Sequence, residues 1–111
     1  MQVRKHERIF EISVRGDVDY AETDLLEAAW AEADEAGTSA TVVDLSGVTF
    51  GDSGLLNALI AARQRHLASG RSLILLGPLQ ESIVRLLRLT GTFEHFTITD
   101  SRSAALEADA G

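Results

Sequence analysis

Apolar segments of two different periods alternate along this chain, and that alternation limits the folds open to it. The short runs at residues 40–45 and 72–76 are rich in apolar residues, which is typical of strands covered on both faces of a sheet. Residues 20–35, 53–69 and 80–90 instead repeat apolar residues at the three- and four-residue spacing of a helix. Strands that alternate with helices predict an α/β sheet with parallel central strands and right-handed crossovers.

The N-terminal segment follows a different pattern. Residues 3–15 predict a β-hairpin with a turn at residues 6–8, because apolar and polar residues alternate from Ile9 to Arg15. Phe10, Ile12 and Val14 should face the core, and Glu11 should lie on the polar face. Gly16-Asp17-Val18-Asp19 is then expected to break the strand before the first helix. Near the C-terminus, a short strand and a final helix that begins at Ser101 complete the prediction.

The helical segments present apolar stripes that should pack on the sheet, and the lone tryptophan, Trp30, is expected in the core. The predicted inward residues are Leu25, Leu26, Ala29, Trp30, Ala33, Leu56, Leu59, Ile60, Leu67, Ile83, Leu86 and Leu87.

Length and composition fit one globular domain over residues 1–111, because 45% of the 111 residues are hydrophobic. There are no cysteines, which excludes disulfides and thiolate chemistry. The formal net charge of −7 opposes sequence-independent binding to nucleic acid. No secretion signal and no apolar run long enough for a bilayer is seen, so we expect a cytoplasmic protein without a membrane partner.

The stretch from Val42 to Ile60 carries the strongest functional signal. A buried strand should end at Asp44, a loop should follow, and a helix should begin at Asp52-Ser53. A serine at a helix N-terminus can cap the helix, because its oxygen accepts an otherwise unpaired backbone N–H. The same position also favours a phosphate, since free N–H groups and the helix dipole attract negative charge. Local sequence leaves both interpretations of Ser53 open.

An enzyme is a weaker interpretation of the same residues. Gly51-Asp52-Ser53-Gly54 is not the Gly-x-Ser-x-Gly nucleophile elbow of hydrolases. His66 would lie roughly 20 Å from Ser53 along the helix at about 1.5 Å per residue, and is interpreted as a solvated helix residue. The three histidines form no metal-binding pair, and no glycine-rich phosphate loop is present. We therefore expect no catalytic residues, no metal and no cofactor.

Four motifs in order along the chain resemble the STAS domain family. They are Gly16-Asp17-Val18-Asp19, Asp44-Leu45-Ser46-Gly47-Val48-Thr49-Phe50, Asp52-Ser53, and Gly77-Pro78 followed by Val84-Arg85-Leu86-Leu87 and Leu89-Thr90-Gly91. Within that family the chain is most similar to single-domain anti-sigma factor antagonists. The resemblance implies a STAS fold, with a mixed β-sheet, an N-terminal hairpin and about four helices. The family usually has a second hydroxyl residue after Asp-Ser, whereas this chain has Gly54 followed by Leu55.

The resemblance also implies a function. Unphosphorylated antagonists bind an anti-sigma factor, a serine kinase of the histidine-kinase-like ATPase type, and this binding releases the sigma factor. Phosphorylation of the antagonist's serine separates the pair, and a serine phosphatase resets the cycle. Ser53 falls on the phosphorylated position. The residues expected to contact the partner are Asp17, Asp19, Gly51, Asp52, Gly54, Leu55 and Asn57.

A STAS scaffold or subunit of a stress-sensing or lipid-transport complex is the alternative that the resemblance leaves open. The proteins that co-purify with the chain would separate the two, because a kinase-like anti-sigma factor supports the first interpretation and membrane transporter subunits support the second.

Overall fold

A five-stranded sheet with the strand order β1-β2-β3-β4-β5 forms the centre of the molecule. The computed structural model describes residues 1–6 and 8–107. β1 (Gln2–His6) pairs antiparallel with β2 (Ile9–Val18), and the remaining neighbours pair in parallel. The α/β class, the parallel central strands and the N-terminal hairpin are thereby confirmed. Glu7, in the predicted turn, lies outside the described residues.

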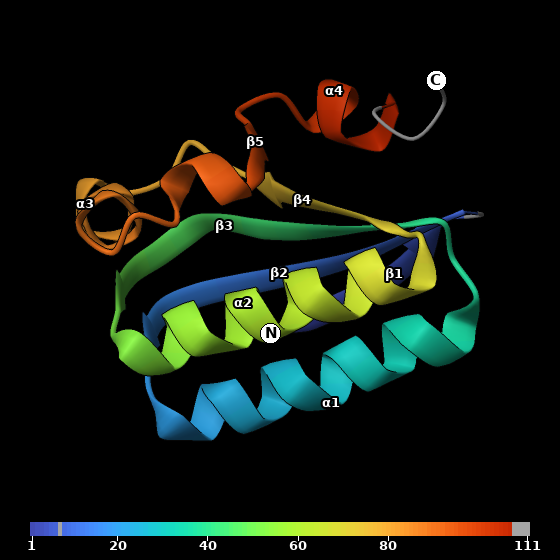
Figure 1. Cartoon of the computed structure of the whole chain (residues 1–111), viewed down its shortest axis with the longest axis horizontal. Helices are drawn as coiled ribbons and strands as arrows, with labels where there is room; N and C mark the ends of the chain where they lie inside the picture. Colours follow the sequence, from blue (N-terminus) through green and yellow to red (C-terminus); the bar gives the residue numbers. More distant parts are fainter. Residues whose placement is uncertain (7, 108–111) are drawn as a thin grey trace.

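Two long helices, α1 (Tyr20–Ala36) and α2 (Ser53–Ser69), cover one face of the sheet side by side (Figure 1). Trp30 lies between them with no exposed surface, and its indole N–H donates to the carbonyl oxygen of Ala58 at 3.1 Å. This confirms Trp30 as a core residue. Leu25 and Leu67, also predicted to face inward, are 51% and 63% exposed, because each lies on the solvent side of its helix.

The opposite face of the sheet is covered by a short C-terminal helix, α4 (Arg102–Glu107), as Figure 1 shows. Ala105 of α4 packs there against apolar residues of β2, β3 and β4. This cover explains why the prediction that Glu11 lies on a polar outer face is wrong. The Glu11 carboxylate is buried and accepts hydrogen bonds from Arg102 at 2.6 Å and from His6 at 3.0 Å.

β3 (Ala40–Gly51) is longer than predicted and has no loop between Asp44 and Asp52. β2 likewise continues through Gly16, which was expected to break it, and Gly16 has a φ of 75°. The two extended segments pair with each other, and register shifts between Ser13 and Arg15 and between Gly16 and Asp17 accommodate them. Such irregularities let a strand bend and twist without losing its partner.

The remaining elements follow the predicted order. β4 (Ser72–Leu76) is a central strand, α3 (Glu81–Leu89) packs through Ile83 and Leu87, and a 3₁₀ turn (Phe93–His95) leads into β5 (Thr97–Thr99). The final helix begins one residue after Ser101, whose hydroxyl accepts the N–H of Ala104 at 3.1 Å.

Candidate functional site at the N-terminus of α2

Asp52, rather than Ser53, caps α2. Its backbone is extended, with φ −106° and ψ −165°, and its carboxylate accepts the N–H of Gly54 at 2.8 Å. A side chain that accepts from the second or third helical N–H is the defining contact of an N-cap. Because Asp52 makes that contact, the interpretation of Ser53 as the capping residue is wrong.

The Ser53 side chain is exposed at the first position of α2. Its hydroxyl makes no hydrogen bond to any residue in the part of the chain that the structure describes. A hydroxyl at the positive end of a helix, in solvent and not used for capping, is sterically open to a modifying enzyme. The helix dipole there also favours an added negative charge.

Two glycines near Ser53, Gly51 and Gly54, lie where neighbouring side chains leave little room for a Cβ atom. A Cβ on Gly51 would lie 2.3 Å from Cδ2 of Leu55, so no larger residue fits without repacking. A Cβ on Gly54 would lie 2.9 Å from the Asp52 carboxylate and 3.3 Å from Cγ2 of Thr23. A second hydroxyl residue at position 54 would therefore press on the cap, which gives a physical reason for glycine in this chain.

The structure brings the predicted acidic residues to the same end of the sheet. The register pairs Asp17 with Phe50 and Val18 with Gly51, so the ends of β2 and β3 lie side by side immediately before α1 and α2. Asp17 is exposed, and its carboxylate accepts the Thr49 hydroxyl at 2.8 Å. Asp19, also exposed, directly precedes α1.

The other residues predicted to contact a partner differ in accessibility. Asn57 is exposed on the first turns of α2, whereas Leu55 has no exposed surface and packs behind Gly51. A direct partner contact by Leu55 is therefore contradicted by its burial; its side chain packs inside the molecule against Gly51, the last residue of β3. Gly51 is also buried.

The sequence did not point to Phe50, an aromatic residue that is 54% exposed at the end of β3. Only the extension of β3 puts residue 50 on the outer side of a strand, so no local pattern could have identified it. The neighbouring residue Thr49 connects the end of β3 to α3, because its carbonyl oxygen accepts a hydrogen bond from the Ser82 hydroxyl at 3.0 Å.

His66 is not the solvated residue that the sequence predicted. It is 1% exposed, and its ring nitrogens lie 2.6 Å from the Thr41 hydroxyl and 2.6 Å from the Ala62 carbonyl oxygen. Burial lowers the pKa of His66 below its ordinary value, with a partly opposing contribution from the Ala62 carbonyl. Its place on α2, more than three turns beyond Ser53, leaves it out of contact with that serine.

None of the helices in the described ranges combines the length and the apolar content that crossing a bilayer requires. Within the same residues, no group of three or more His, Cys, Asp or Glu side chains is arranged to hold a metal ion.

Solved structures share this fold over nearly the whole chain. An anti-sigma factor antagonist from Mycobacterium paratuberculosis superposes with a TM-score of 0.80 at 27% identity, over 99% of this chain and 92% of that one. The anti-sigma factor antagonist SpoIIAA in its unphosphorylated form gives a TM-score of 0.85 at 15% identity, over 99% and 96% of the two chains. The Bacillus cell fate determinant SpoIIAA in its phosphorylated form gives 0.77 at 14% identity, over 97% of each chain.

A family model described as "Mlab, STAS domain" matches residues 1–98. That match spans the strands β1 to β4, the helices α1, α2 and α3, and the first two residues of β5. The chain therefore belongs to the STAS domain family.

Proposed function

We propose that this chain is an anti-sigma factor antagonist whose binding to its partner is switched off by phosphorylation of Ser53. The observation that carries the proposal is the exposed Ser53 hydroxyl at the start of α2, free because Asp52 supplies the cap. Two similarities support it. The antagonist from Mycobacterium paratuberculosis shares 27% identity over 99% of this chain, and SpoIIAA has been solved in a phosphorylated form.

In this proposal the partner surface is the end of the sheet where α2 begins. Its exposed or partly exposed predicted members are Asp17, Asp19, Asp52, Gly54 and Asn57. We add Phe50, because an exposed aromatic ring among polar residues can serve as the apolar anchor of an interface.

The switch itself would be electrostatic. A phosphoserine carries about −1.5 to −2 charges at neutral pH. At Ser53 it would adjoin the Asp52 carboxylate, which already occupies the N–H of Gly54. The phosphate would then use the remaining free N–H groups of the first turn, so the fold would persist while the surface became more negative. A loss of roughly 3 kcal/mol in binding corresponds to about a hundredfold in affinity.

The partner in this proposal is a serine-kinase anti-sigma factor of the histidine-kinase-like ATPase type in the bacterial cytoplasm, and a serine phosphatase reverses the modification. The first test is the intact mass of the protein after incubation with ATP and a candidate kinase from the same organism. We expect one added phosphate on the wild type and none on Ser53→Ala.

Ser82→Ala is a matched control for that test. Ser82 is also an exposed serine in the first turn of a helix, but its hydroxyl donates to the Thr49 carbonyl oxygen. The Ser82→Ala variant should gain one phosphate, as the wild type does. A phosphate retained on Ser53→Ala would refute the assignment of the site.

Binding of the kinase tests the second half of the proposal. Ser53→Ala should bind as tightly as the unphosphorylated wild type, and Ser53→Asp should bind more weakly. Equal binding by the two variants would rule out the electrostatic switch. If no candidate kinase either binds or modifies the protein, the alternative of a STAS scaffold subunit is favoured instead.

A further inference from the structure

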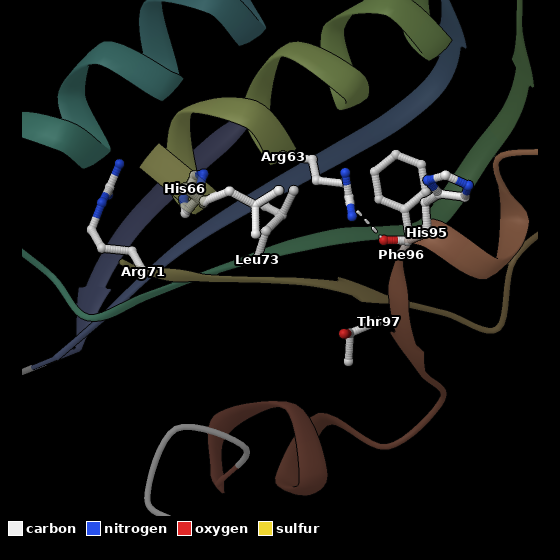
Figure 2. Close-up of a pocket in the computed structure, with 8 residues that line it drawn as sticks. Arg63, His66, Arg71, Leu73, His95, Phe96 and Thr97 are labelled. Carbon is white, nitrogen blue, oxygen red and sulfur yellow. Dashed lines mark hydrogen bonds between the residues drawn. The ribbon is translucent and has the colours of Figure 1, made fainter. Parts of the chain in front are cut away.

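A hollow of about 230 Å³ lies far from Ser53, between the C-terminal half of α2 and the strands β4 and β5. Its lining residues come from α2, from Arg71 and Leu73 just before and within β4, and from the segment that runs from the 3₁₀ turn to β5 (Figure 2). At about 30 Å³ per water molecule, the volume corresponds to roughly seven or eight waters. It is large enough for a small organic molecule.

The charged and titratable side chains that line the hollow all carry nitrogen: Arg63, His66, Arg71 and His95. Among the residues that the structure describes, no carboxylate lines it, although the chain as a whole has a net charge of −7. On the neighbouring helix α1, the carboxylate of Asp34 bonds two guanidinium groups, those of Arg65 and Arg71. Glu94, exposed in the 3₁₀ turn beside His95, is a second carboxylate in this region. The three arginines Arg63, Arg65 and Arg71 exceed these two carboxylates by one positive charge.

Arg63 is the residue in this group that is available to a ligand. Its Nε donates to the carbonyl oxygen of His95 at 2.8 Å, which fixes the guanidinium over the hollow (Figure 2). Its two terminal nitrogens have no partner among the described residues. Arg71 differs, because its guanidinium is turned toward α1, where it donates to the Ala33 carbonyl oxygen at 3.1 Å and to Asp34.

The two histidines have different roles. His66 is buried and bonded to Thr41, and the lowered pKa that results from its burial keeps it neutral near pH 7, so it forms a wall of the hollow. His95 is exposed at the rim, and an imidazole in any protonation state presents at least one N–H donor. Arg63 and His95 are therefore the two lining side chains with N–H groups available to an anion.

The rest of the lining is largely apolar and comes from Leu67, Leu73 and Phe96. Leu67 is 63% exposed and leaves an apolar lip beside the guanidinium. An anion that also carries a small apolar group could pair with Arg63 and, at the same time, cover the exposed side chain of Leu67. A few polar groups placed in an otherwise apolar concavity is the usual composition of a small-molecule site.

We propose that this hollow binds a small organic oxyanion, a carboxylate or a phosphate monoester with a compact apolar group. Arg63 holds the oxyanion through its terminal nitrogens, His95 adds a donor, and Leu73 and Phe96 contact the apolar part. The site is separate from the Ser53 surface, and its test uses neither a kinase nor ATP, so either proposal can fail without the other.

The test is a titration of the ¹⁵N-labelled chain, followed by amide and arginine side-chain NMR signals. The probes are benzoate, phenyl phosphate and the neutral benzamide. We expect saturable shifts of the Arg63 Nε–H and of the Leu73 and Thr97 amides with benzoate or phenyl phosphate. Which of the two binds more tightly identifies the oxyanion, and benzamide should bind at least tenfold more weakly.

Variants on the same helix make the test specific. Arg63→Gln should weaken binding of the oxyanion at least tenfold, whereas Arg63→Lys, which keeps the charge, should lose less. Arg65→Gln is the matched control and should bind within twofold of the wild type, because Arg65 pairs with Asp34 outside the hollow. Shifts that do not saturate, equal binding of benzamide, or equal loss in Arg63→Gln and Arg65→Gln would overturn the proposal.

Discussion

The replacement Asp52→Ala tests which residue caps α2, and with it the free hydroxyl on which the proposed function depends. The carboxylate accepts the Gly54 N–H at 2.8 Å, so the alanine variant leaves that donor without its side-chain partner. Loss of an N-cap costs about 1 kcal/mol, within a range of about 0.5 to 2. Loss of a negative charge at the helix N-terminus adds about 0.3 to 1 kcal/mol. We expect Asp52→Ala to lower the free energy of unfolding by about 1–2 kcal/mol.

For a chain of this length, a loss of 1 kcal/mol lowers the midpoint of thermal unfolding by roughly 4 °C. The expected fall is therefore about 4–8 °C, measured by circular dichroism and checked by urea unfolding. Asp52→Asn keeps a capping oxygen and loses only the charge, so its midpoint of thermal unfolding should fall by less than that of Asp52→Ala. Ser53→Ala should stay within about 0.5 kcal/mol of the wild type, because the hydroxyl bonds nothing in the described structure.

The reasoning is refuted if Ser53→Ala is destabilised as much as Asp52→Ala. That result would mean that the serine hydroxyl supplies the cap in solution. The Ser53 hydroxyl would then not be free, and it would no longer support the proposed phosphorylation.

Three further predictions concern the supporting structure. Gly51→Ala should cost about 1–3 kcal/mol in urea unfolding, because its Cβ would lie 2.3 Å from Cδ2 of the buried Leu55; an unchanged midpoint would contradict the close packing. Trp30→Phe should cost about 2 kcal/mol by the same measurement, since the Ala58 carbonyl oxygen loses a buried donor and the core loses volume. The lowered pKa of His66 means that the unfolded chain binds a proton that the folded chain resists, so stability due to this group falls as pH drops below about 6.5. Unfolding at several pH values should show this slope in the wild type, reaching at most about 1.4 kcal/mol per pH unit, and His66→Gln should lack it; identical slopes would contradict a neutral buried imidazole.

The succession of strands and helices was determined by the sequence itself, because it depends on local periodicity and local stop signals. α2 begins and ends at the predicted residues, Ser53 and Ser69. Gly70, which has a φ of 70° and ends this helix, adopts a backbone conformation that favours glycine wherever it occurs. The covered strand Ser72–Leu76 could be predicted for the same reason, since its composition already implied two buried faces.

Burial of individual polar residues was decided only by the tertiary structure. Glu11 alternates with apolar neighbours as an exposed residue would, but α4, which is distant in sequence, covers that face and supplies Arg102. His66 likewise became a core residue because Thr41 of a neighbouring strand gives its ring a partner. Periodicity indicates which face a residue occupies, and it does not indicate what covers that face.

In the candidate site, too, some features could be predicted from the local sequence and others were decided by the tertiary structure. The Asp52-Ser53 pair and the helix that follows it could be predicted from the sequence, since a cap and a helix start are local features. Which of the two residues caps the helix could not, because aspartate and serine are both good N-caps and the choice depends on the backbone that β3 delivers. The exposure of Phe50 follows from the irregular pairing of β2 with β3, and pairing between strands distant in sequence is set by the assembled sheet.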